Sequence, residues 1–206
     1  MKRLPYSIAP LRYSSASDAS GGWGRGPTPA GEPNGAGAAP AAGVTVRKAT
    51  VRDVPTMARI INHWASQGIM LAKSHHQLYQ YIRDFVVATH GDVVIGCGAL
   101  HVVWEDLAEV RSMAVADGWH GKGVGWRMLQ CLLDEARELG LPRVFALTYR
   151  QSFFARAGFQ VVPHESLPHK IWGDCLNCPK YPNCDEIAMT LDLSAITAED
   201  DRAERQ

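Results

Sequence analysis

The sequence predicts one domain of the α/β class, with a mixed sheet and helices on both of its faces. Helical and extended periodicities follow one another in the order βααβββαβαβ, and this alternation predicts a sheet covered by helices. The composition, with 46% hydrophobic and 20% charged residues, is ordinary for a globular chain. Residues 44–193 carry the pattern and have the length of one typical domain.

The two ends of the chain differ from this domain in composition. Residues 1–43 contain 8 of the 19 glycines and 6 of the 12 prolines. Such a stretch cannot bury enough apolar surface to offset its ordering entropy, so we interpret it as a disordered extension and a passive tail. We expect residues 194–206 to form a short, frayed acidic tail.

The domain begins with a predicted strand at Val44–Arg47. Asp53 can cap the helix that follows, with Pro55 in its first turn, and Gly68 ends it. The apolar face of this helix consists of Met57, Ile60, Ile61 and Trp64.

A second helix and a hairpin come next. Ser74 with Gln77 three residues later is a capping box, which predicts a helix through Arg83. Phe85–His90 and Val93–His101 are predicted strands, joined by a Gly-Asp pair that is typical of a two-residue turn.

The second half of the domain alternates strands and helices. Ala108–Val115 is a predicted strand, and Gly125–Leu139 is a predicted helix that Gly140 closes. The apolar side of this helix consists of Val124, Met128, Leu132, Leu133 and Ala136. The remaining predicted elements are a strand at Val144–Tyr149, a short helix at Ser152–Ala157, and strands at Phe159–Val162 and Ile187–Leu193.

Charge, apolar runs and cysteines exclude several classes of protein. The 21 basic and 21 acidic residues cancel, whereas nucleic-acid binders usually carry a net basic surface. No apolar run approaches the roughly 20 residues that cross a bilayer, so we expect neither a nucleic-acid nor a membrane partner. Pro5 and Pro10 interrupt any signal-peptide core, and five cysteines without such a signal are no disulfide scaffold. We expect a cytoplasmic protein.

The segment Val115–Gly125 runs from a predicted strand into a predicted helix and has glycines at 121, 123 and 125. Uncovered backbone amides can converge on one anion there, and the helix adds its positive dipole, as in a cradle for a diphosphate. The spacing is neither that of a Walker loop nor that of a dinucleotide-binding loop. The alternative is a glycine-rich corner without a ligand.

The residues around this loop resemble the GCN5-related N-acetyltransferase (GNAT) family. The family's central motif is matched by Met113–Val115 and by Trp119–Gly125, with His120 where Gln or Arg is usual. Its second signature is matched by Phe153–Phe159, and the resemblance covers residues 44–193. It implies a mostly antiparallel sheet and acetyl-CoA as the acyl donor.

Several longer stretches, such as ALHVVWEDLAEVRSMAV and FALTYRQSFFARAGF, resemble short stand-alone bacterial amino-acid N-acetyltransferases. These make N-acetylglutamate at the head of arginine synthesis, so the resemblance implies a small amino-acid substrate. Family members are often homodimers, for which the strand pair 159–162 and 187–193 could carry an interface. The implied acetyl-CoA contacts are Met113, Ala114, Val115, His120, Gly121, Lys122, Gly123, Val124, Gly125 and Phe154.

Two residues are candidates for proton transfer. Glu109 sits where some family members carry a general base, but it could instead pair with Arg111. Many family members place a tyrosine acid where this chain has Phe154, and Tyr149 could substitute for it or could simply be a sheet residue.

Three cations are candidates for holding the acceptor. Arg111 could grip a carboxylate of a small acidic amino acid bidentately, or it could serve only as the partner of Glu109. Lys73 and Lys170 are further candidates, with solvated surface as the alternative for each.

Cys175, Cys178 and Cys184 lie within ten residues and could form a zinc knuckle. The alternative is a loop of free cysteines, so we assign no residue as a metal ligand. Cys97 and Cys131 are expected in the core.

The leading hypothesis is therefore acetyl transfer from acetyl-CoA to L-glutamate. One alternative is another amine acceptor, such as glutamine, a polyamine, an antibiotic or a protein N-terminus. The other alternative is a non-catalytic acyl-CoA-binding module.

Overall fold

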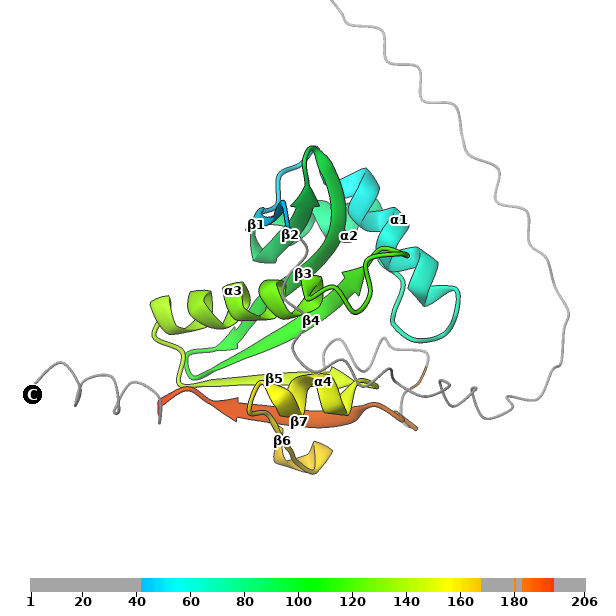
Figure 1. Ribbon diagram of the computed structural model, residues 1–206. Helices are drawn as coiled ribbons and strands as arrows, with labels where there is room; N and C mark the ends of the chain where they lie inside the picture. The colour runs from blue at the N-terminus through cyan, green and yellow to red at the C-terminus, as the bar shows by residue number, and fades with distance from the viewer. Residues whose placement is uncertain (1–41, 168–179, 181–182, 195–206) are drawn as a thin grey trace, which may run out of the picture. The chain divides into compact units, whose positions relative to one another are not determined.

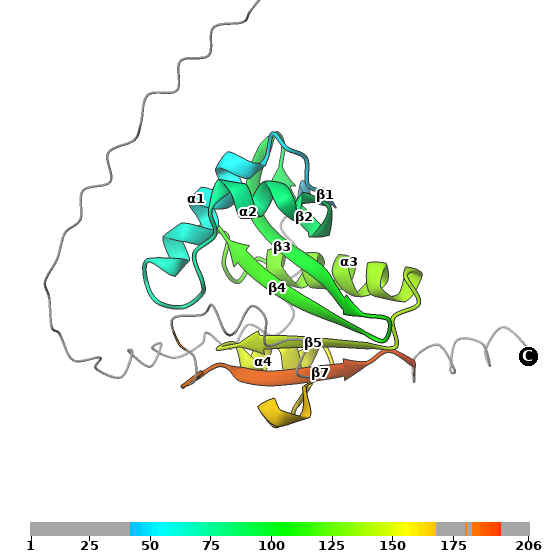
Figure 2. The same cartoon turned by 180° about the vertical axis from the view of Figure 1, so that it is seen from behind.

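The computed structural model describes residues 42–167, 180 and 183–194, which form a seven-stranded sheet with helices on both faces (Figures 1 and 2). The strand order is β1-β2-β3-β4-β5-β7-β6. The strands are β1 (Val44–Lys48), β2 (Phe85–His90), β3 (Val93–Trp104), β4 (Leu107–Val115), β5 (Arg143–Thr148), β6 (Gln160–Val161) and β7 (Ile187–Asp192). The helices are α1 (Val54–Ala65), α2 (His75–Gln80), α3 (Val124–Glu138) and α4 (Gln151–Arg156), with short 3₁₀ turns η1 (Ile82–Asp84) and η2 (His164–Ser166).

Within the described ranges, β4 and β5 are the one parallel pair, and the other neighbouring strands run antiparallel. The predicted mixed, mostly antiparallel sheet is therefore confirmed. A parallel pair needs a crossover, and α3 supplies it between β4 and β5.

The two faces of the sheet carry separate cores. Figure 1 shows α3 and α4 on one face, and Figure 2 shows α1 and α2 on the other. The α3 side buries Met128, Leu129, Leu132 and Leu133 against strand residues such as Val86, Val110 and Val144. The α1 side buries Val54, Met57, Ile61 and Leu78 against Phe85, Val87 and Cys97. None of the described helices is both long enough and apolar enough to span a bilayer.

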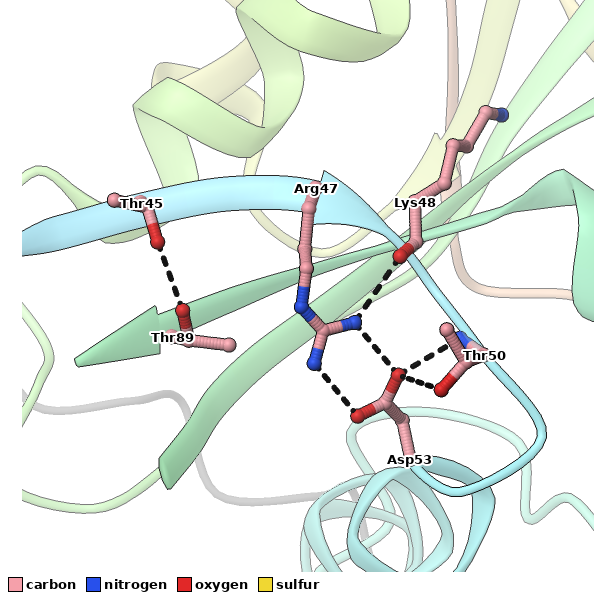
Figure 3. Close-up of polar contacts among 6 residues, drawn as sticks. All are labelled: Thr45, Arg47, Lys48, Thr50, Asp53 and Thr89. Carbon is pink, nitrogen blue, oxygen red and sulfur yellow. Dashed lines mark hydrogen bonds and ion pairs between the residues drawn. The ribbon is translucent and has the colours of Figure 1, made fainter. Parts of the chain in front are cut away.

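The capping box predicted at the start of α2 is present, because Ser74 and Gln77 hydrogen-bond reciprocally. The predicted position of Asp53 at the start of α1 is correct, but the predicted capping hydrogen bond is absent. Asp53 occupies the N-cap position of α1, but its side chain makes no capping hydrogen bond. Its carboxylate instead binds Arg47 at 2.7 and 2.9 Å and the amide of Thr50 at 2.7 Å (Figure 3).

This carboxylate joins β1 to α1 from a nearly buried position, since only 8% of the Asp53 side chain is exposed. The hydrogen bonds from Arg47, together with those from Thr50, lower the pKa of Asp53 to about 2 against the opposing effect of burial. The charged form is therefore the one that the fold stabilises.

Candidate active site

The site begins where β4 and β5 separate. They pair only at Ala108 with Val144 and at Glu109 with Phe145. Beyond these pairs the two strands diverge, as both views of the ribbon show (Figures 1 and 2). The backbone of Met113–Val115 therefore has no β5 partner and can hydrogen-bond to a ligand that enters the gap.

A bulge in β4 lies at the start of this divergence. Arg111 pairs with Ala99 and Ala114 pairs with Cys97, so β4 holds one more residue than β3 between these pairs. Ser112 has φ of 54°, a left-handed conformation that is uncommon for a residue with a side chain. A Cβ at Gly98 would lie 2.3 Å from Sδ of Met113, so the Met113 side chain occupies space that a larger residue at position 98 would take.

The loop between β4 and α3 has the backbone of an anion site. Gly121 and Gly123 both have φ of 73°, whereas Lys122 between them does not have a positive φ. Such alternation turns successive amides toward one point and forms a concave nest. The amides in the first turn of α3 have no hydrogen-bond partner inside the helix, and they point out of its N-terminal end toward the loop. The loop can therefore hold a diphosphate by its main chain.

The carbonyl of Val115 anchors this loop. It accepts a hydrogen bond of 2.8 Å from Nε1 of Trp64 on α1 and one of 3.0 Å from Nε2 of His120. The His120 and Trp64 rings also meet edge to face. The His120 side chain thus points toward the protein backbone. The predicted contact of His120 with acetyl-CoA stays a prediction.

The other residues that are predicted to contact acetyl-CoA differ in their exposure to solvent. The Nζ atom of Lys122 lies 4.9 Å from the centre of the Trp119 ring, at the exposed rim of the loop. Val124 is buried against the sheet, so only its backbone is available to a ligand. Gly125 lies beside the Phe153 ring, where even an added Cβ would make ordinary contacts. Phe154 is 5% exposed and packs between Phe153 and Phe159 as a core residue.

Glu109 and Arg111 stand on the α2 side of β4, which we call the acceptor face. Their side chains are 16% and 11% exposed, and Nη1 of Arg111 lies 3.7 Å from Oε2 of Glu109. The guanidinium of Arg111 also stacks 5.2 Å from the centre of the Tyr81 ring. The structure therefore brings together the predicted base and the predicted carboxylate clamp, next to the gap between β4 and β5.

Tyr149 follows β5 on the opposite side of the gap. Its hydroxyl donates to Asp185 and accepts from Nζ of Lys180, and Lys180 lies 3.0 Å from Asp185. Burial raises the pKa of Tyr149 to about 12, and the Asp185 carboxylate adds to the shift while Lys180 opposes it. The phenol is therefore protonated at neutral pH, as a general acid must be.

The remaining predicted residues are placed only in part. The backbone of Lys73 is held by Asn62 through bonds of 2.9 and 3.0 Å in the α1–α2 connection. Lys170, Cys175 and Cys178 lie outside the described residues. The described residues hold no group of three potential metal ligands, so the zinc hypothesis stays without a test.

A separate open hollow of about 560 Å³ lies between α1 and the β2–β3 turn. Arg59, Trp64, Asp92 and Asp117 are among its lining residues. It contains none of the predicted catalytic or acceptor residues, and its large opening to solvent is unlike an enclosed small-molecule site. The gap between β4 and β5, with Glu109 and Arg111 beside it, is the candidate site.

Sequence reasoning missed several residues that shape the site. Trp64 was expected only as part of an apolar helix face, and the sequence gives no sign of its bond to Val115. Tyr81 and His101 lie outside the two family motifs. His101 stands beside Glu109 through strand register, and Tyr81 meets both His101 and Arg111 from the end of α2. Lys180 and Asp185 meet Tyr149 only through the pairing of β5 with β7.

The fold and the loop agree with comparisons to known proteins. Residues 57–159 match the model of the acetyltransferase (GNAT) family. An uncharacterized N-acetyltransferase of Chlorobaculum tepidum is 42% identical over 75% of this chain and 99% of its own length. The amino-acid acetyltransferase of Mycobacterium tuberculosis is 38% identical over 73% of this chain and 86% of its own length.

Two solved structures are similar as well. A Mycobacterium tuberculosis protein in complex with CoA and NLQ has a TM-score of 0.65 and 34% identity, over 72% of this chain and 99% of that one. N-acetylglutamate synthase of Neisseria gonorrhoeae, complexed with CoA and N-acetyl-glutamate, has a TM-score of 0.67 and 30% identity. That alignment covers 73% of this chain and 35% of the synthase. The chain belongs to the GNAT family of acetyltransferases, and it is an acyltransferase that uses acetyl-CoA as its donor.

Proposed function

We propose that the chain transfers the acetyl group of acetyl-CoA to the α-amino group of L-glutamate, as the first step of arginine biosynthesis in the cytoplasm. The observation that carries this proposal is Arg111, a largely buried guanidinium on the acceptor face beside Glu109. A guanidinium in such a place suits a carboxylate, because it presents paired donors in a fixed plane. Relatives named amino-acid acetyltransferase and the synthase structure support the same choice of substrate.

The donor is held mainly by backbone. In this proposal the nest at Gly121–Gly125 binds the diphosphate, and the free edge of Met113–Val115 pairs with the pantetheine arm. An amide near Ala114 or Val115 then donates to the thioester oxygen as negative charge develops on it. Lys122 at the rim of the loop adds positive charge near the phosphates.

The chemistry uses both sides of the gap. Glu109 takes a proton from the substrate ammonium, and the resulting amine attacks the thioester carbon. The carbon–sulfur bond breaks, and Tyr149 gives its proton to the departing thiolate. The attacking nitrogen then loses its second proton, which restores the Tyr149 hydroxyl. Because the Tyr149 hydroxyl points at Asp185 in the structure, it must turn from that carboxylate toward the sulfur.

Arg111 holds a glutamate carboxylate, with Lys73 and Lys170 as further cations for the second one. Arg111 already contacts Glu109 at 3.7 Å, which is longer than a hydrogen bond. In this proposal the substrate carboxylate binds the guanidinium on the acceptor face, beside its contact with Glu109.

A thiol-release assay with acetyl-CoA and each of the twenty amino acids tests the proposal. We expect glutamate to give the highest kcat/KM, with glutamine at least about tenfold lower because it lacks the side-chain charge. A higher value for glutamine or another amino acid would identify a different acceptor. Release with polyamines but with no amino acid would reject the amino-acid assignment.

A further inference from the structure

We propose that His101, oriented by Asp84, carries the proton released by the reaction from Glu109 to solvent. The inference rests on the proposed role of Glu109 as the base. His101 lies on β3, outside the glycine-loop motif and the second family signature.

The stoichiometry of the reaction calls for such an exit. A substrate ammonium has to lose two protons to become an amide nitrogen with one hydrogen. One proton ends on the CoA sulfur as a thiol, and the other leaves the protein. Glu109 is only 16% exposed, so a group between it and water would shorten the path of that second proton.

Asp84 and His101 form an oriented pair. Nδ1 of His101 lies 2.7 Å from Oδ2 of Asp84, a residue of η1 just before β2. An ionised carboxylate can only accept a hydrogen bond, so Nδ1 carries the hydrogen in neutral His101. This tautomer leaves a lone pair on Nε2, which can take a proton.

The register of the sheet places this ring next to the proposed base. His101 of β3 stands directly opposite Glu109 of β4 in the antiparallel ladder. Opposite residues project to the same face, with Cβ atoms about 4.5–5.5 Å apart. The His101 side chain is 29% exposed, more than that of Glu109, so it reaches both the acceptor face and water.

The surroundings of His101 come from three elements. Tyr81 at the end of α2 meets the imidazole edge to face at 5.4 Å. Arg111 lies on the same tyrosine ring, and Asp84 comes from η1. On the β5 side, Glu109 pairs with the apolar Phe145. The titratable or charged groups described around the imidazole are thus Asp84, Tyr81, Glu109 and Arg111.

The proposed step follows from this arrangement. Glu109 takes a proton from the substrate ammonium and becomes neutral. That proton passes to Nε2 of His101, which restores the Glu109 carboxylate, and the imidazolium then loses its Nε2 proton to water or buffer. No electrons are transferred, and His101 returns to the tautomer that Asp84 holds.

Loss and rescue of turnover test this role. In a bulky buffer, His101→Ala should lower kcat by about tenfold or more, in line with the size of acid–base effects, with both KM values nearly unchanged. Added imidazole should restore kcat in a saturable manner, since it replaces the missing ring. Wild-type protein should not respond to imidazole. The proposal would be overturned if His101→Ala kept the wild-type kcat. It would also be overturned if the folded variant lost kcat and added imidazole did not restore it.

Asp84→Asn provides a second variant that keeps the ring and its packing. The new amide can donate to Nδ1 and so favour the tautomer with hydrogen on Nε2, which cannot accept a proton. We expect a similar loss of kcat without rescue by imidazole, and an unchanged kcat would contradict the relay. His76→Ala, at an exposed position on α2, is the matched control and should behave as wild type.

The same variants separate this inference from the choice of substrate. Each is assayed with whichever amino acid the thiol-release screen identifies. A failure of glutamate as acceptor therefore leaves the relay testable. Conversely, normal turnover of glutamate in the His101 variants rejects the relay alone.

Discussion

The indole nitrogen of Trp64 and the carbonyl oxygen of Val115 are joined by a hydrogen bond of 2.8 Å. The bond ties the last turn of α1 to the last residue of β4, next to the glycine loop. Helix α1 therefore helps to fix the position from which the loop departs, although it supplies no residue of the family motif.

Trp64→Phe should loosen this connection while it keeps an aromatic ring packed against the core. We expect the KM for acetyl-CoA to rise several-fold, because the carbonyl loses one of its two donors, and kcat at saturation to change little. His120→Gln serves as the comparison and should be nearly neutral, since Gln can also donate to that carbonyl. Steady-state kinetics with varied acetyl-CoA checks both, and an unchanged KM in Trp64→Phe would show that the bond does not position the loop.

Gly123, one of the two left-handed glycines of the loop, should be far less replaceable than Gly125 two residues later. Gly123 has φ of 73°, a conformation that costs a residue with a Cβ about 1–2 kcal/mol. Gly123→Ala should therefore raise the KM for acetyl-CoA by about tenfold. Gly123→Asp should raise it further, because it adds a negative charge where phosphate binds.

Gly125→Ala is the matched control for this prediction. Its Cβ would lie 3.6 Å from the Phe153 ring, an ordinary contact. We expect nearly normal binding of acetyl-CoA by calorimetry. Normal binding in Gly123→Asp as well would contradict the assignment of the loop as a diphosphate cradle.

Arg111→Lys should affect the two substrates unequally. A lysine replaces a planar fork with a point charge and loses the stacking on Tyr81. We expect the KM for glutamate to rise by about tenfold or more and the KM for acetyl-CoA to stay within about twofold. Arg59→Lys, an exposed exchange on α1, is the control. Equal losses for both substrates would show that Arg111 supports the fold rather than the acceptor.

Asp53 makes the stability of the fold depend on pH. Its folded pKa is about 2, below the unfolded value of about 3.9. The charged carboxylate therefore stabilises the protein above pH of about 4, and this contribution is lost as pH falls from about 4 to about 2. We expect Asp53→Asn to lower the free energy of unfolding by about 2 kcal/mol at neutral pH, with a smaller difference at pH 3.

Asp134→Asn is the matched control for Asp53→Asn. Asp134 also pairs with an arginine, Arg137, at 2.7 Å, but its side chain is 65% exposed. Such surface pairs contribute at most about 1 kcal/mol. Urea denaturation at both pH values measures the two variants. A loss at Asp53 no larger than at Asp134 would mean that the Arg47 contact adds no net stability.

Much of the fold could be predicted because local signals and global pairing agree. The strand at Val93–His101 and the helix at Gly125–Leu139 were located by periodicity to within a few residues of β3 and α3. The side chain of Asp53 departed from its predicted cap because Arg47 and Thr50 offered it stronger partners. That competition arises only once β1 lies beside α1.

The parts of the site that are contiguous in the sequence could be predicted, and the parts that strand pairing brings together could not. The glycine loop is contiguous, so its pattern could be read along the chain. The His101–Glu109 pair depends on strand register, and the Tyr149 cluster depends on the pairing of β5 with β7. Neither register nor a bulge such as that at Ser112 leaves a periodic signal in the sequence.

Product identification tests the proposed reaction most directly. The purified chain is incubated with isotopically labelled acetyl-CoA and an equimolar mixture of the twenty amino acids, and labelled products are identified by mass spectrometry. We predict that the label appears predominantly in N-acetyl-L-glutamate, on the α-nitrogen. Label that accumulates mainly on another amino acid, or on none of them while the donor stays intact, would contradict the proposed function.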